Sequence, residues 1–143
     1  MKTNIFLGLI FFAGIIFLGG CEEDLFDVFG DPRDRITGEW KVEEDSEIFK
    51  KKDTNRFYSV NITKDPNDST VIYIDGFYEL SGKVKVNMNG YTLSIPDQTI
   101  EGFTIQDGSG SITFNYKSMT LYYYVSFTGE RDVVRADYTR PSN

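Results

Sequence analysis

Apolar and polar residues alternate almost without a break from Ile36 to the C-terminal region, and this two-residue period most constrains the fold. It is clearest in residues 36–43, 58–62 and 121–127, where every second residue is apolar or glycine. Successive side chains of a strand point to opposite faces of a sheet, so the pattern is typical of half-buried β-strands. Turn-forming clusters separate eight or nine such stretches, and only residues 43–55 could hold a short helix. The sequence therefore predicts an all-β fold.

The segment 83–95, KVKVNMNGYTLSI, gives the most specific local prediction. Asn89-Gly90 is the pair preferred by a two-residue type I′ turn, in which both central residues have positive φ. A turn there places apolar residues opposite one another on one face of the hairpin and polar residues on the other. The expected apolar pairs are Met88 with Tyr91, Val86 with Leu93 and Val84 with Ile95.

Consecutive hairpins joined by short turns favour an up-and-down antiparallel β-barrel of about eight strands, because a closed barrel leaves no edge strand exposed. A two-sheet β-sandwich is the alternative architecture. We assign residues 36–143 to this domain, which is long enough to bury a core of its own.

Residues 1–20 have the features of a bacterial signal peptide. Lys2 gives a positive start, and residues 5–18 form an apolar or small-residue run of 14 residues. As a helix this run would be about 21 Å long, short of the roughly 30 Å hydrocarbon core of a bilayer, so it fits a cleaved leader better than a membrane span. Leu18-Gly19-Gly20-Cys21 then resembles a lipobox, the signal at which the chain is cut between Gly20 and Cys21 and the cysteine is acylated. Cys21, the only cysteine of the chain, is expected to carry the lipid anchor; a plain secretory leader with an incidental cysteine is the alternative.

Residues 21–35 are expected to be a lipidated acidic tether, broken by Gly30 and Pro32. Glu22, Glu23 and Asp24 resemble the export signal that directs lipoproteins of the Bacteroidetes to the outer face of the outer membrane. A solvated acidic linker is the alternative. We therefore expect an outer-membrane, lipid-anchored protein, exposed at the cell surface where the triplet acts as the export signal.

The composition excludes several kinds of chemistry. The chain has no histidine, so a Ser-His-Asp triad is impossible and the commonest neutral metal ligand is missing. No pair of carboxylates lies in a recognisable acid–base motif, and no acidic group has the spacing of a calcium loop. Loss of the leader removes one lysine and takes the net charge from −7 to −8, which disfavours binding to nucleic acid. We expect no enzymatic activity, no cofactor, no metal site and no nucleic-acid partner.

Gly38-Glu39-Trp40 on the first expected strand resembles the G-x-W motif of lipocalins. With the stretches ITGEW, NGYTLSIPDQTI and VVRADYTRP, it makes most of residues 36–141 similar to the small lipocalin-like lipoproteins of the Bacteroidetes. The resemblance implies a barrel whose base is closed by an arginine lying on the tryptophan, here Arg135 or Arg140, in a cation–π contact. It also implies a small or apolar ligand inside the barrel, whereas the twelve Phe and nine Tyr of the chain favour an interior filled by side chains.

Two surface features are further candidates. Tyr122 and Tyr124 lie on the face of their strand opposite to Tyr123, and where that face is exposed they offer flat aromatic area to a sugar or a partner. A strand buried on both faces, or covered by the tether, is the alternative. Ser69, in Asp68-Ser69-Thr70, matches the short O-glycosylation motif of exported Bacteroidetes proteins. The chain is therefore expected to bind a small or apolar ligand, or instead to serve as an accessory subunit of an outer-membrane complex through a protein-binding surface.

Overall fold

The computed structural model describes residues 30–50 and 55–142, so the expected leader, Cys21 and the acidic triplet lie outside the described residues. Two 3₁₀ segments, η2 (Pro32–Arg35) and η3 (Phe77–Glu79), and one short helix, α1 (Glu47–Lys50), accompany the strands in this part of the chain. The helix falls within residues 43–55, as expected. The strands are β1 (Gly38–Ser46), β2 (Arg56–Lys64), β3 (Val71–Asp75), β4 (Lys83–Asn89), β5 (Thr92–Ile95), β6 (Gln98–Ile100), β7 (Phe103–Ile112), β8 (Ser118–Phe127) and β9 (Glu130–Thr139).

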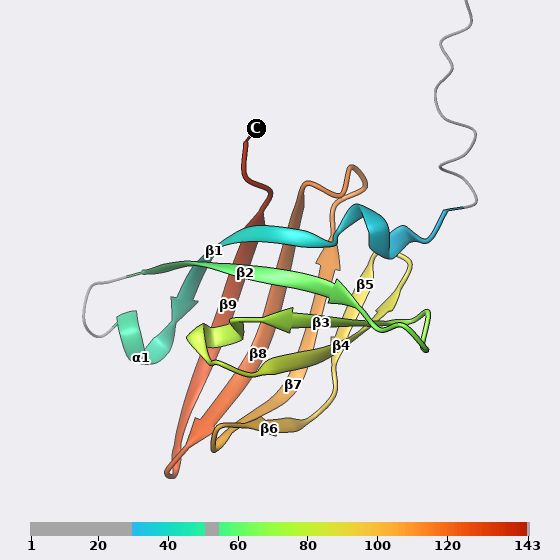
Figure 1. Cartoon of the computed structure of the whole chain (residues 1–143). Coiled ribbons are helices and arrows are strands. Elements are labelled where there is room, and N and C mark those ends of the chain that lie inside the picture. The colour runs from blue at the N-terminus through green and yellow to red at the C-terminus, as the bar shows by residue number, and fades with distance from the viewer. Residues whose placement is uncertain (1–29, 51–54, 143) are drawn as a thin grey trace, which may run out of the picture.

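Eight of these strands form a closed antiparallel barrel (Figure 1). Each strand from β1 to β4 pairs with the next one in the chain, and β5 pairs with β7. The ring is completed by the pairs β7–β8, β8–β9 and β9–β1. The edge of β7 is shared, because β5 pairs with residues 108–111 and the extra strand β6 pairs with residues 103–105. The predicted up-and-down barrel is confirmed, and the two-sheet sandwich is wrong.

Side chains that alternate between apolar and polar in the sequence point alternately into and out of the barrel. On β1, Trp40, Val42, Glu44 and Ser46 are buried, while the residues between them are exposed or half-buried. Buried apolar side chains from all eight barrel strands merge into one continuous core. Burial of apolar surface is the main stabilising contribution in such a domain. The interior of the described barrel is therefore packed with its own side chains.

Two glycines of β7 show how closely this interior is filled. A Cβ atom on Gly108 would lie 2.4 Å from Cβ of Ile95, and one on Gly110 would lie 2.4 Å from both Cδ2 of Leu121 and the carbonyl oxygen of Thr120. Ile95 and Leu121 are core residues. A bulge between Gln106 and Ser109 shifts the register of β7 against β8, so that Gly108 lies within the bulge and Gly110 just after it. Only residues without a side chain fit where the strands approach so closely.

The β4–β5 hairpin exists, but its predicted register is wrong by one residue on each strand. Asn89 pairs with Thr92 and Met88 with Leu93, so the turn is Gly90-Tyr91 instead of Asn89-Gly90. Tyr91 is held outside the hairpin ladder because its carbonyl oxygen accepts a hydrogen bond of 2.8 Å from the backbone N–H of Ile112. Contacts with β7 therefore set the register. Each residue of β4 thus pairs two positions further along β5 than predicted, and the same residues still face inward.

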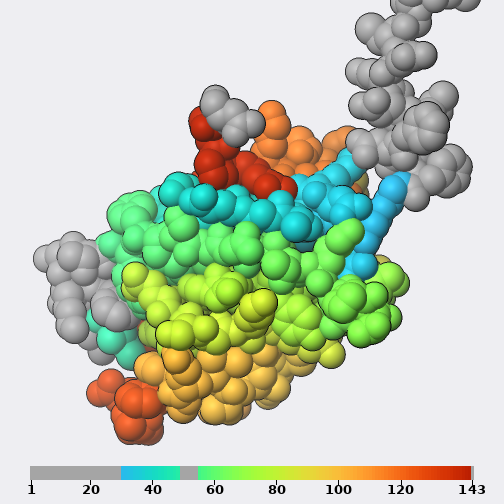
Figure 2. Space-filling view, in the orientation of Figure 1, coloured from blue at the N-terminus to red at the C-terminus, as the bar shows by residue number. Residues whose placement is uncertain are grey.

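The two ends of the barrel differ. η2 crosses one end, together with the loops 65–70 and 113–117 and the β4–β5 turn, and we call this the η2 end (Figure 1). α1 and η3 lie at the opposite end. In Figure 2 the strands follow one another across the visible face as consecutive colour bands. In the described residues, no helix has the length and apolar character needed to cross a bilayer.

The close approach at Gly110 predicts the cost of adding one methyl group. Gly110→Ala should lower the free energy of unfolding by about 1–3 kcal/mol, because the new Cβ meets backbone as well as the Leu121 side chain. Urea unfolding of residues 22–143 measures this difference. The matched control is Ser111→Ala, at an exposed position on the same strand, which should change stability by less than about 0.5 kcal/mol. Equal stability of the two variants would contradict a closely packed interior.

Candidate functional site

Trp40 and Arg140 close the η2 end from inside. The Trp40 side chain is fully buried, and its Nε1 donates a hydrogen bond of 2.7 Å to the carbonyl oxygen of Ile36. The Arg140 guanidinium lies 4.7 Å from the centre of the indole ring. It also donates to the carbonyl oxygens of Thr37, at 2.9 Å, and Arg35. This arginine therefore joins the end of β9 to the segment that leads into β1.

Gly38 completes this arrangement, and Arg135 is not part of it. Gly38 has a φ of +107°, and a Cβ atom there would lie 3.4 Å from Nη1 of Arg140. Arg135 lies on the outer face of β9 and forms an ion pair of 3.0 Å with Asp137. The structure thus places Gly38, Trp40 and Arg140 together, and it places the other arginine candidate elsewhere because residues 135 and 140 fall on opposite faces in a two-residue period.

Arg33 fixes η2 onto the barrel. Its side chain is buried, and Nη1 donates to the carbonyl oxygens of Asp65, Asp68 and Val71 at 2.7–3.0 Å. An ion pair of 2.7 Å with Asp31, together with hydrogen bonds from Arg33, lowers the pKa of the Asp31 carboxyl to about 2. Residues 31–35, which the sequence analysis assigns to the tether, therefore pack as part of the barrel domain. The signal was present in the sequence, because Asp31 followed by Pro32 is a typical helix N-terminus.

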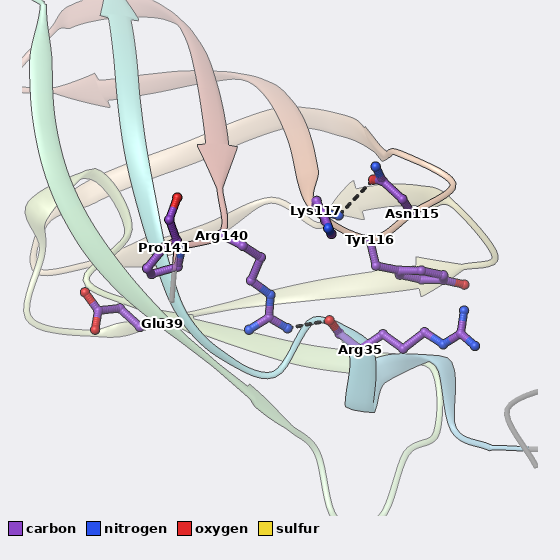
Figure 3. A pocket seen from close by; sticks show the side chains of 8 residues that line it. Arg35, Glu39, Asn115, Tyr116, Lys117, Arg140 and Pro141 are labelled. Carbon is purple, nitrogen blue, oxygen red and sulfur yellow. Dashed lines mark hydrogen bonds between the residues drawn. The ribbon is translucent and has the colours of Figure 1, made fainter. Parts of the chain in front are cut away.

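A groove of about 1080 Å³ opens beside this closure (Figure 3). Its lining combines cations with a carboxylate and an aromatic ring. Glu39, the carboxylate, forms an ion pair of 3.0 Å with Lys41. Lys117 and Arg140 have no carboxylate partner among the described residues. The lining residues are Arg35, Glu39, Asn115, Tyr116, Lys117, Arg140, Pro141 and Ser142.

A second cluster, buried toward the opposite end, is built around Glu44. The Glu44 side chain is completely buried, and its carboxylate accepts hydrogen bonds from Arg56 at 3.1 Å, from Tyr123 at 3.1 Å and from Tyr58. Burial raises the pKa of Glu44 above its usual value, although the neighbouring hydroxyls and Arg56 oppose this effect. Burial likewise raises the pKa of Tyr58 and of Tyr123. The carboxylate is thus retained in the core by satisfied hydrogen bonds.

Asp132 extends the same cluster. Its carboxylate accepts hydrogen bonds from Ser46 at 2.5 Å, Tyr78 at 2.7 Å and the backbone N–H of Ile48 at 3.1 Å. The hydroxyl of Tyr138 is buried and has no hydrogen-bond partner among the described residues. Sequence reasoning missed this cluster. The available signal was the parity of the strands, because Glu44 and Asp132 occupy inward positions of β1 and β9.

The outer face of β7, β8 and β9 carries the tyrosine candidates. Tyr122 is 52% exposed and Val133 is 39% exposed, so this strand face is not covered within the described residues. Tyr124 is half-buried because the Arg131 guanidinium lies 3.7 Å from its ring centre. A shallow groove of about 480 Å³ runs along Tyr122, Tyr124, Val133, Asp107 and Ser109. Among the described residues, no segment buries Tyr122 on this face, whereas residues 21–29 of the tether lie outside them.

The remaining candidates are placed as follows. Ser69 is exposed in the loop 65–70, where the side chain of the neighbouring Asp68 accepts hydrogen bonds from Thr70. Gly20, Cys21, Glu22, Glu23 and Asp24 lie outside the described residues. Among residues 30–50 and 55–142, no group of three or more Cys, Asp or Glu is arranged to hold a metal ion.

No protein-family model matches the chain, and no curated protein matches it by sequence. The function is therefore inferred from the fold and from the geometry of the sites.

The Arg140–Trp40 contact predicts a large effect from a conservative change. Arg140→Gln should lower the free energy of unfolding by about 1–2 kcal/mol, since it removes the cation–π contact and two charge-assisted hydrogen bonds. Because Trp40 is the only tryptophan, its fluorescence should also move to longer wavelength as water reaches the ring. Arg135→Gln, the matched control, should change neither property. An unchanged spectrum and stability for Arg140→Gln would contradict its closing role.

Proposed function

We propose that this chain is a lipid-anchored lipoprotein of the outer membrane whose barrel works without catalysis, as an accessory subunit that docks an envelope protein on its outer surface. The observation that carries the proposal is the contrast between the inside and the outside of the barrel. Inward side chains form one continuous core, whereas the aromatic and apolar groups of Tyr122 and Val133 remain open to solvent. Exposed apolar and aromatic groups gathered beside a groove are typical of partner surfaces.

A small or apolar ligand inside the barrel is the second candidate function. It is supported by the lipocalin-like strand order and by the buried polar cluster around Glu44, where the Tyr138 hydroxyl has no partner among the described residues. Such a ligand would have to displace Phe77, which is fully buried with its ring 4.5 Å from that of Tyr123. Displacing packed aromatic side chains costs several kcal/mol, so we place the outer surface first.

The lipid anchor rests on the sequence Leu18-Gly19-Gly20-Cys21, and the outer-membrane location rests on Glu22, Glu23 and Asp24. A thioether-linked diacylglycerol with a further acyl chain holds a protein stably at a membrane, because each buried methylene contributes about 0.8 kcal/mol. The kinship with lipocalin-like lipoproteins of the Bacteroidetes is part of the same proposal. Non-catalytic action is supported by the lack of histidine and by the burial of Glu44 and Asp132 away from substrate.

Lipidation is tested by Cys21→Ser in a bacterial host that processes lipoproteins. The variant should accumulate as unprocessed precursor and take up no labelled fatty acid, because the thiol that forms the thioether is missing. Leu25→Ser, a change after the cleavage site, serves as the control and should be processed and labelled normally. Equal labelling of the Cys21→Ser chain would show that the lipobox assignment is wrong.

The docking surface is tested by photo-crosslinking in intact cells. A photoreactive amino acid in place of Tyr122 should give a discrete crosslinked band with one envelope protein. The same amino acid in place of Phe57, which is 71% exposed on β2, is the matched control and should give none. Identical patterns at both positions, or no adduct at position 122, would count against a partner on this face.

A further inference from the structure

A second surface, at the η2 end, has a composition unlike that of the rest of this acidic chain. Three aromatic rings meet there: Tyr91 and Phe114 are exposed and Tyr116 is half-buried. Between ring centroids, Tyr91 lies 5.3 Å from Tyr116 and 5.7 Å from Phe114. Phe114 is 84% exposed, more than any other large apolar side chain of the described residues. Lys117 and Arg140 border the same loop and line the groove of Figure 3. We call Tyr91, Phe114, Tyr116, Lys117 and Arg140 the aromatic–basic rim.

The loop that presents Phe114 is held in one conformation. The backbone N–H groups of Thr113 and Tyr116 donate to the carbonyl oxygens of Ser118, at 2.8 Å, and Thr113, at 2.9 Å. The side chain of Asn115 accepts from the Thr113 hydroxyl at 2.8 Å and from the Lys117 backbone N–H at 3.1 Å. These bonds fix the loop while leaving the phenyl ring in water. A Phe side chain left exposed on an ordered loop lacks the stabilisation of about 1.5–3 kcal/mol that burial would give, and contact with an apolar medium would restore it.

The charges of the rim favour an anionic surface. Lys117 makes no ion pair within the described residues, and the groups that Arg140 contacts are carbonyl oxygens and the Trp40 ring. Both cations are retained beside a groove in a chain with a net charge of −7. The acidic residues of this end are either paired or distant from these cations. Glu39 lines the same groove but pairs with Lys41. Asp31 pairs with Arg33 and Asp34 with Lys64, whereas Asp65 and Asp68 lie in the loop 65–70 on the opposite side of η2. The η2 end therefore has a basic side and an acidic side.

The proposed anchor brings this same end to the membrane. Gly30 lies two positions before the start of η2, and nine residue steps separate it from Cys21. A chain of this length spans at most about 32 Å even when fully extended. The opposite end of the barrel is a further β-strand away, and β8 alone has 10 residues, or about 33 Å along the strand. A short link of this kind gives the rim an effective concentration at the bilayer of the order of millimolar.

We propose that the aromatic–basic rim docks on the phosphate-bearing headgroups of the bilayer in which the Cys21 lipid is inserted, with Phe114 and Tyr91 entering the interface. This rests on the proposed lipid anchor. Aromatic rings with a polar tip and cations on long stems are the side chains that favour the membrane–water interface. Docking through one side orients the barrel, because the acidic loop 65–70 is repelled by the same headgroups.

The test uses the full-length lipidated protein, with acylation first verified by mass. Because Cys21 is acylated, an introduced cysteine is the only free thiol, and it takes an environment-sensitive fluorophore. Labels are placed at Asn115→Cys beside the rim, at Ser69→Cys in the acidic loop and at Glu130→Cys at the opposite end. A label at Ser142→Cys, in the adjoining groove, leaves the hydrogen bonds of the loop intact and should report the same protection as the label at 115. The protein is reconstituted into phosphatidylcholine vesicles with and without phosphatidylglycerol, some carrying a headgroup quencher.

The label at 115 should be quenched by the headgroup quencher and protected from a water-borne reductant, more strongly with phosphatidylglycerol, while the labels at 69 and 130 remain in water. Lys117→Gln should lower the ratio of docked to undocked protein about fivefold, since one cation near an anionic surface contributes about 1 kcal/mol. Lys83→Gln, which removes an exposed lysine at the start of β4, next to η3 at the opposite end, is the matched control and should leave the ratio unchanged.

Equal exposure of the labels at 115 and 130 in correctly acylated protein would overturn the docking proposal and leave the anchor intact. Failure of acylation at Cys21 would instead overturn the anchor itself, and docking with it. Protection of position 115 in native envelopes but not in vesicles would also overturn the proposal, because it would identify a protein as the occupant of the rim.

Discussion

Pairing of β5 with β7 is the constraint on which the rest of this structure depends. It closes a row of consecutive hairpins into a ring, so that every barrel strand has two neighbours. Every second residue of the alternating sequence then faces one common interior. The pairing is possible because β7 carries Gly108 where it approaches Ile95 of β5, and Gly110 allows the similarly close approach to Leu121 of β8 on the other side. Once the ring is closed, its interior volume is set, and the inward side chains of eight strands fill it. A barrel with a filled interior has its outer surface and its two ends left for function.

The ends of the barrel are closed by different chemistry. At the η2 end, Arg140 stacks on Trp40 and binds backbone carbonyl oxygens, and Arg33 holds η2 on the loop 65–70. At the other end, two buried carboxylates, Glu44 and Asp132, are surrounded by donors. Such buried polar groups stabilise the fold only while every partner is present. Because both arrangements tie together segments far apart in sequence, they fix the ends of the strands relative to one another.

Much of the fold followed from the sequence because period-two alternation reports directly which side chains face inward. The all-β class, the barrel and the inward positions of Trp40 and Tyr123 all rest on that pattern. The hairpin register did not follow, because Tyr91 is positioned by Ile112, a residue brought close only by barrel closure. The cluster around Glu44 was missed for a related reason: the sequence shows that an acidic residue faces inward, but not which tyrosines surround it. Tertiary contacts made after closure decided each of these points.

We infer that the interior of the barrel is filled by its own side chains and that binding takes place on its outer surface. Native mass spectrometry of the lipidated protein, recovered from its own envelope in mild detergent, tests this most directly. We expect a species at the mass of the acylated polypeptide, with no small molecule retained. A non-covalently bound mass of a few hundred daltons, released on gentle activation and absent from protein unfolded before analysis, would show that the barrel is a ligand carrier and would contradict the account.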